Sequence, residues 1–168
     1  MQGIKLESWH IELGIPGFLV RATIQPRGDL MIYLNNQTYT SFTFNDVELL
    51  PLGADYQIKG VKQAMMNVNR QAISFMTVTE PDKASKVQLL QSKRPIVFYT
   101  EWFAVRGDLH VNTETPDENL LDDKFEFFMI TEATIYPLRA VNHRPLAKAP
   151  AVAFNRKAIL AYHAQNQA

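Results

Sequence analysis

The feature that most constrains the fold of this chain is an internal repeat. Arg27-Gly28-Asp29-Leu30 recurs as Arg106-Gly107-Asp108-Leu109, which is 79 positions later (27 to 106). At the same offset Pro16 matches Pro95, and the apolar run Phe18-Leu19-Val20 matches Val97-Phe98-Tyr99. Self-similarity at a fixed offset indicates that one structural unit is written more than once.

The match continues later in the chain at a second offset, 86 positions (69 to 155). Pro51-Leu52 matches Pro137-Leu138, and Asn69-Arg70-x-Ala72-Ile73 matches Asn155-Arg156-x-Ala158-Ile159. The offset changes by seven near the polar stretch 112–118, which has the composition of a loop and can absorb an insertion. These matches, which follow one order with a single change of offset, predict a tandem duplication.

The repeat predicts the domain organisation. We expect an N-terminal segment over residues 1–15, a first repeat over 16–78, a linker over 79–94 and a second repeat over 95–168. Residues 82–92 and 156–165 are compatible with either a helix or a strand, and the sequence leaves that choice open.

Within each repeat the pattern favours about five short strands. β-branched and aromatic residues, period-two alternation and intervening turn residues are typical of strands in small barrels or sandwiches. The predicted strands are 18–25 and 30–34 on either side of an Arg-Gly-Asp turn, 42–49, 65–68 and 72–78, with 96–105, 128–135, 151–154 and 158–162 in the second repeat.

Two short motifs carry a resemblance to a known family. The first is Gly28-Asp29-Leu30 followed by Phe42-x-Phe44-x-Asp46-Val47, with Gly107-Asp108-Leu109 and Phe128-x-Ile130-x-Glu132-Ala133 in the second repeat. The second is an apolar residue, a two-residue turn and an apolar return, as in Val68-Asn69-Arg70-x-x-Ile73 and Phe154-Asn155-Arg156-x-x-Ile159.

Each repeat thereby resembles the Sm-like small β-barrel, and the same pattern suits an SH3-like barrel. The family's usual Arg-Gly or Lys-Gly turn and its RNA-contacting Asn do not occur cleanly here. The chain is also similar to bacterial proteins of unknown function that carry such modules in tandem. The resemblance implies an all-β fold of two tandem five-stranded barrels, with a short helix before each, and it implies no activity.

Composition restricts the functional class. Seventeen basic and seventeen acidic residues balance to zero net charge, which argues against a general nucleic-acid binder. The chain has no cysteine, so it has no disulfide or zinc–thiolate site. No secretory leader and no apolar run long enough to span a membrane are visible, and we expect a soluble, cytoplasmic protein.

The best candidates for a binding site are the two Asn-Arg turns: Asn69, Arg70, Asn155 and Arg156. In an Sm-like barrel, the resemblance implies that this turn faces the pore of a ring, where it can meet RNA or an acidic ligand. The favoured alternative is structural. Asn then occupies a left-handed turn position, and Arg pairs with a nearby acid such as Asp46 or Glu132.

Aromatic residues concentrate in the second repeat beyond what one thin barrel can bury. We interpret Tyr99, Trp102, Phe103, Phe125 and Phe127 as a contact between the repeats or between subunits, with a base-stacking platform as the minor alternative.

No catalytic or cofactor motif stands out. The histidines at 10, 110, 143 and 163 lack metal-ligand spacing, the acidic stretch near 117–123 lacks the pattern of a calcium loop, and the two Arg-Gly-Asp triplets have turn composition. We therefore expect no enzyme, no cofactor and no metal. The preferred hypothesis is a non-enzymatic assembly or scaffold module that forms a homo-oligomer. The alternative is an Sm-like module that binds single-stranded RNA through the Asn-Arg turns.

Overall fold

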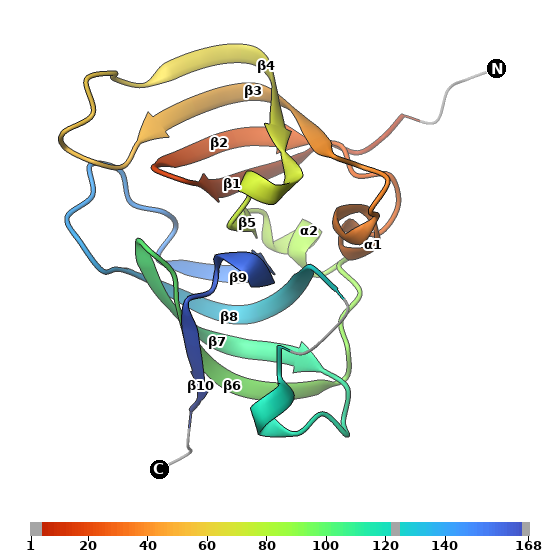
Figure 1. Cartoon of the computed structure of the whole chain (residues 1–168). Coiled ribbons are helices and arrows are strands. Elements are labelled where there is room, and N and C mark those ends of the chain that lie inside the picture. The colour runs from red at the N-terminus through yellow and green to blue at the C-terminus, as the bar shows by residue number, and fades with distance from the viewer. Residues whose placement is uncertain (1–4, 122–124, 166–168) are drawn as a thin grey trace.

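The computed structural model describes residues 5–121 and 125–165, and in these residues the protein is all-β (Figure 1). Ten strands form one antiparallel sheet: β1 Trp9–Ile15, β2 Phe18–Ile24, β3 Ser41–Pro51, β4 Val61–Asn69, β5 Phe75–Val78, β6 Ser92–Tyr99, β7 Phe103–Val111, β8 Phe127–Pro137, β9 Lys148–Asn155 and β10 Ala161–Ala164. The helices are short: α1 Leu30–Asn35, α2 Pro81–Ala84 and the 3-10 turns η1 Arg70–Ala72, η2 Asp117–Asn119 and η3 Arg156–Ala158. None of the helices in these ranges is long and apolar enough to cross a membrane.

The order of strands across the sheet is β10-β6-β7-β8-β9-β5-β1-β2-β3-β4. We call the part with β1 to β5 the N-half, the part with β6 to β10 the C-half, and the antiparallel pairing of β5 with β9 the seam. Each half therefore has the same internal order, in which its fifth strand lies beside its first. Figure 1 shows the N-half above the C-half, with β4 at the top and β10 at the lower left.

The hydrophobic core is shared between the halves. One cluster of buried residues consists mainly of N-half side chains but includes Phe127, Met129, Ala151 and Ala153 of the C-half. A second cluster consists mainly of C-half side chains but includes Leu19, Leu50, Leu52 and Phe75 of the N-half. Burial of apolar area across the seam therefore helps to hold the halves together.

Each half contains a β-bulge at the same place. The pairing of β2 with β3 shifts between Arg21 and Thr23, and the pairing of β7 with β8 shifts between Arg106 and Asp108. Opposite these shifts, Asp46 and Glu132 adopt left-handed φ values of 50° and 51°. A bulge with a left-handed residue bends its strand, so the acidic residue of the repeated motif marks a bend in both halves.

Strand pairing corrects the first part of the sequence match. Phe18 pairs with Pro51 in the N-half, and Phe103 pairs with Pro137 in the C-half. Phe18 thus occupies the place of Phe103, an offset of 85 (18 to 103), and the match of Phe18-Leu19-Val20 with Val97-Phe98-Tyr99 is wrong. The offset of 86 does agree with the pairing, since Asn69 pairs with Ser41 and Asn155 pairs with Phe127.

The two Arg-Gly-Asp triplets have different structures. In the N-half, Asp29 caps α1 through hydrogen bonds that its side chain accepts from the Met31 and Ile32 amides, so the predicted strand 30–34 is a helix. In the C-half the triplet lies inside β7 rather than in a turn. A Cβ on Gly107 would lie 2.5 Å from the Ile130 side chain. Glycine is required there by close packing beside the bulge.

Several predicted boundaries also move. β1 lies inside the segment 1–15 that we expected to precede the first repeat. The predicted linker 79–94 contains α2 and the first residues of β6, and the single predicted strand 96–105 is the end of β6, a turn and the start of β7. Of the helices expected before each repeat, α2 precedes β6, whereas residues 5–8 before β1 are not helical. The undecided region 156–165 is η3 followed by the strand β10.

Candidate functional site

The two Asn-Arg turns have the same local structure. Each begins at the end of a strand and forms one 3-10 turn, in which the Asn side chain accepts a hydrogen bond from the amide two residues later. These bonds join Asn69 to Gln71 and Asn155 to Lys157, both at 3.0 Å. The Asn residues have φ values of −59° and −82°, so the expected left-handed conformation is wrong. The side chain itself closes the turn, a common use of Asn.

Arg70 is buried, with 8% of its surface exposed. Its Nη1 lies 2.8 Å from Oε2 of Glu126, its Nε donates to the Leu34 carbonyl oxygen at 3.1 Å, and its guanidinium lies over the Phe127 ring at 5.8 Å. The turn arginine does pair with an acid, but the acid is Glu126 of the C-half rather than Asp46 or Glu132. Sequence alone could not identify this partner because the contact spans the seam.

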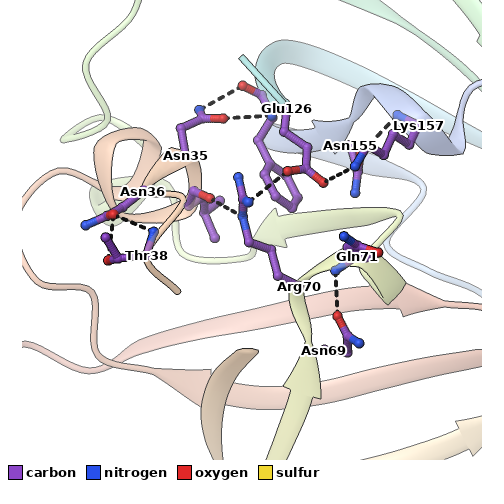
Figure 2. A network of polar contacts seen from close by, with 11 residues as sticks. Asn35, Asn36, Thr38, Asn69, Arg70, Gln71, Glu126, Asn155 and Lys157 are labelled. Atoms are coloured by element: carbon purple, nitrogen blue, oxygen red, sulfur yellow. Dashed lines mark hydrogen bonds and ion pairs between the residues drawn. The ribbon is translucent and has the colours of Figure 1, made fainter. Parts of the chain in front are cut away.

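Glu126 connects the two turns (Figure 2). While its Oε2 faces Arg70, its Oε1 lies 3.4 Å from the Lys157 ammonium nitrogen. The backbone carbonyl of Glu126 also accepts a hydrogen bond from the Arg156 amide at 2.8 Å. The tertiary structure therefore brings η1 and η3 together around one carboxylate, although they are far apart in the sequence.

The four predicted site residues differ in accessibility. Arg70 and Asn155 are buried, Asn69 is exposed, and Arg156 is half-buried, with its Nη1 donating to the Leu121 carbonyl at 3.4 Å. Lys157, which the sequence did not single out, has 59% of its side chain exposed.

A further polar contact joins α1 to β8 across the seam. The Asn35 side chain donates to the Phe127 carbonyl and accepts from the Phe127 amide, both at 2.9 Å (Figure 2). Sequence reasoning missed Asn35 because it missed α1. The available signal was Asp29, a preferred N-cap residue, placed before Leu30 and Leu34, which share one face of a helix.

The C-half also reaches over the N-half through the loop between β8 and β9. The Asn142 amide donates to the Leu52 carbonyl at 2.9 Å, and the Leu146 amide donates to the buried carboxylate of Glu12 at 2.6 Å. Glu12 Oε2 also accepts from the Arg21 Nε at 3.1 Å. The seam is thus supported by strand pairing, by the Arg70–Glu126 ion pair and by contacts of the loop between β8 and β9.

The predicted interface aromatics lie in different environments. Phe103 and Phe127 are core residues, and Phe127 packs in the cluster that contains side chains of both halves. Trp102 is half-buried, with the Arg139 guanidinium 4.5 Å from its ring centroid. Tyr99 is half-buried and its hydroxyl lies 3.2 Å from His163 Nε2, while Phe125 is exposed. These side chains do not form one continuous stacking platform.

A largely apolar cavity of about 580 Å³ lies between α1, the segment 88–90 and β8. One buried histidine lines it: His110 Nδ1 lies 3.0 Å from the Leu90 carbonyl, and Nε2 lies 2.7 Å from the Thr131 hydroxyl. Because a carbonyl only accepts, Nδ1 is the donor to Leu90. In residues 5–121 and 125–165 no group of three His, Asp or Glu side chains is placed to hold a metal ion.

The polar contacts of this region hold the two halves together. Arg70 and Asn35 bond to Glu126 or to nearby backbone groups. Among the described residues, Glu126 Oε1 is buried without a hydrogen bond and has only the ion pair with Lys157. Paired buried polar groups favour one specific arrangement of the chain. No family model, curated protein or solved structure matches the chain.

Proposed function

We propose that the chain is a non-enzymatic assembly module that joins copies of itself through the outer strands of its sheet. The seam carries the proposal, because it shows two five-stranded halves already joined edge to edge by β5 and β9. The sheet ends in β10 and β4, each of which pairs with one strand in the described part of the chain. An edge strand with free N–H and C=O groups is a template for another strand.

The halves are proposed to be duplicated small barrels of the Sm-like or SH3-like kind. Three observations support this: the shared strand order, the offsets of 85 and 86 in strand pairing, and the left-handed acidic residue at each bulge. If the halves are duplicates of one unit, the strand edge that pairs in one half has an equivalent edge in the other half. The seam uses the fifth strand of the N-half and the fourth strand of the C-half, which leaves β10 and β4 for contacts of the same kind.

The outer strand β4 lacks the usual protection against strand addition. It runs from Val61 to Asn69, is largely exposed, contains no proline and has Lys62 as its one charged residue. Proteins that avoid edge association place charges, prolines or bulges on such strands. The composition of β4 therefore supports a strand that pairs with another molecule.

RNA binding is the less supported function. The Arg70 guanidinium is engaged with Glu126 and Leu34, so it cannot reach a phosphate without breaking those contacts. The zero net charge also gives no long-range attraction for a polyanion.

The test is the solution mass, measured by light scattering on a sizing column with and without a short mixed-sequence RNA. We expect a defined oligomer whose mass does not change when RNA is added. A monomer at all concentrations contradicts the assembly function. An RNA-dependent increase in mass at low salt replaces it with the binding function, and in that case Arg156→Ala and Lys157→Ala weaken the increase.

A further inference from the structure

The seam inside the chain defines which residues of the two outer strands are able to meet. Its register pairs Phe75 with Phe154, Met76 with Ala153, Thr77 with Val152 and Val78 with Ala151. The strand pairings show that β10 is the C-half counterpart of β5, and that β4 is the N-half counterpart of β9. Both correspondences have an offset of 86 (75 to 161, and 68 to 154). Applying that offset to the seam gives one register for β10 against β4.

We infer that β10 of one molecule pairs antiparallel with β4 of a second copy in this register. The pairs are Ala161 with Val68, Tyr162 with Asn67, His163 with Met66 and Ala164 with Met65. This inference rests on the proposed assembly function and specifies its contact. The contact is head-to-tail, so the molecules form a closed ring or an open filament rather than a two-fold dimer.

The backbone hydrogen-bonding groups on the two edges are complementary in this register. In β10, the Gln165 amide donates to Pro95 on the neighbouring strand β6, so alternation points the Tyr162 and Ala164 amides outward. In β4, the Arg70 amide donates to Thr40, so the Met65 and Asn67 amides point outward. The outward-facing residues are the ones that the inferred register pairs with each other, Tyr162 with Asn67 and Ala164 with Met65.

One seam hydrogen bond has a direct counterpart at the outer edges. Within the chain, the Asn155 amide donates to the Ser74 carbonyl at 2.9 Å. The same offset predicts that the Asn69 amide of one copy donates to the Leu160 carbonyl of the other. Leu160 is already held in the matching way, because its amide donates to Tyr99 at 2.8 Å just as the Ser74 amide donates to Gly14.

Exposed apolar side chains flank both edges. Leu160 is 72% exposed beside β10, and Met65 is 60% exposed on β4. The loop after β3 exposes Tyr56 and Ile58, and Leu138 is exposed in the C-half. The contact of Asn142 with Leu52 inside the chain corresponds, at the same offset, to Tyr56 of one copy against Leu138 of the other. Burying this apolar surface favours a second copy of the chain as the occupant.

Head-to-tail pairing also satisfies both edges with one kind of contact. A symmetric pairing of β4 with β4 leaves β10 open on both molecules, and β10 with β10 leaves β4 open. Pairing β10 with β4 uses each edge once, and a closed ring leaves neither exposed. A contact that repeats the seam between molecules therefore favours pairing of β10 with β4 over pairing of either strand with its own copy.

The experiment is disulfide trapping, which the absence of cysteine makes direct. The variant Met65→Cys/Ala164→Cys places thiols at an inferred pair, where Cα atoms of a hydrogen-bonded antiparallel pair lie about 5.5 Å apart, within the range of a disulfide. Under mild oxidation we expect covalent multimers on a non-reducing gel. The largest covalent multimer should have the mass that light scattering gives for the wild-type oligomer. Met65 and Ala164 lie on opposite outer strands, so the trapped bond is intermolecular.

Three controls make the result specific. Met65→Cys alone and Ala164→Cys alone do not cross-link in the inferred arrangement. Met65→Cys/His163→Cys is the matched register control, because neighbouring residues of β10 face opposite sides of the sheet. Cross-linking by Met65→Cys alone indicates β4 with β4 and overturns the inference, and so does cross-linking by the His163 control in place of the Ala164 variant.

The outcome separates the inference from the function on which it rests. An oligomer by light scattering without the cross-link in the Met65→Cys/Ala164→Cys variant overturns the inferred register and leaves the assembly function standing. A monomeric wild type overturns both. An oligomer with the specific cross-link supports both.

Discussion

The Arg70 guanidinium and the Glu126 carboxylate form an ion pair across the seam, with 2.8 Å between Nη1 and Oε2. Both side chains are largely buried, and the same carboxylate also faces Lys157 on the second turn. The Asn-Arg turns, which the sequence suggested as binding loops, are thus held together as part of the junction between the halves.

Removing Arg70 should destabilise the protein strongly. Arg70→Ala leaves the Glu126 carboxylate largely buried without its closest cation and leaves the Leu34 carbonyl without its donor. We expect a loss of about 3 kcal/mol in the free energy of unfolding, measured by urea denaturation. The matched control is Lys157→Ala, which removes the exposed partner of the same carboxylate and should cost less than about 1 kcal/mol. Equal losses for the two variants contradict this account of the site.

Asn35 should matter more than its neighbour Asn36. Asn35→Ala removes both hydrogen bonds to the Phe127 backbone, and we expect a loss of about 2 kcal/mol in unfolding free energy. The Asn36 side chain accepts hydrogen bonds from the amide and hydroxyl of exposed Thr38. Its backbone bonds to Tyr33 and Tyr39 survive the substitution, so Asn36→Ala should change stability by less than about 0.5 kcal/mol. Thermal unfolding followed by circular dichroism checks both. A neutral Asn35→Ala variant shows that α1 does not depend on this contact to dock on β8.

The two Arg-Gly-Asp triplets should respond differently to the same substitution. Asp29 caps α1 and also accepts a hydrogen bond from the Gln88 amide at 2.9 Å. Asp29→Ala should therefore cost about 1 to 2 kcal/mol in unfolding free energy. Asp108 lies in β7, with Lys93 4.0 Å away, and Asp108→Ala should stay within about 0.5 kcal/mol of wild type. The midpoints of urea unfolding compare the two, and similar effects argue against distinct roles for the triplets.

A proline on the outer edge should block assembly without unfolding the molecule. Asn67→Pro removes an outward amide of β4 inside the span that the inferred register pairs with β10. Proline is tolerated on an edge strand when its missing N–H faces solvent. We expect monomers by light scattering and a wild-type circular dichroism spectrum.

Gln63→Pro is the control for that variant, because Gln63 lies on the same outer strand beyond the four inferred pairs. It should leave the oligomer intact. If Asn67→Pro remains folded and fully oligomeric, another surface carries the assembly.

Local sequence patterns predicted much of the strand content. The alternation over 42–49 lies within β3, and its counterpart 128–135 lies within β8. The all-β class was predicted for the same reason, since β-branched and aromatic residues with period two favour a half-buried pleated surface. The Asn residues before η1 and η3 also marked real turns, because a side-chain hydrogen bond that closes a turn is a local interaction.

Short matches misled where the same letters serve different structures. Arg-Gly-Asp begins a helix in one half and lies in a strand in the other, because Asp29 finds the free amides of a helix terminus whereas Gly107 is packed against β8. The offset of 79 counted from these triplets sets β2 against β6, whereas strand pairing makes β7 the counterpart of β2, at an offset of 85. A three-residue match carries little information about register.

The sequence by itself determined the all-β character of the chain, the later strands related by 86 positions, and the turns that follow β4 and β9. The tertiary structure alone decided that β5 joins β9, that Glu126 is the partner of Arg70, and that β4 and β10 are the outer strands. The first group depends on interactions among residues that are close in the sequence, so the local sequence pattern is enough to predict it. The second depends on contacts between residues distant in sequence, which form only when the whole sheet selects one arrangement of strands and buries its core.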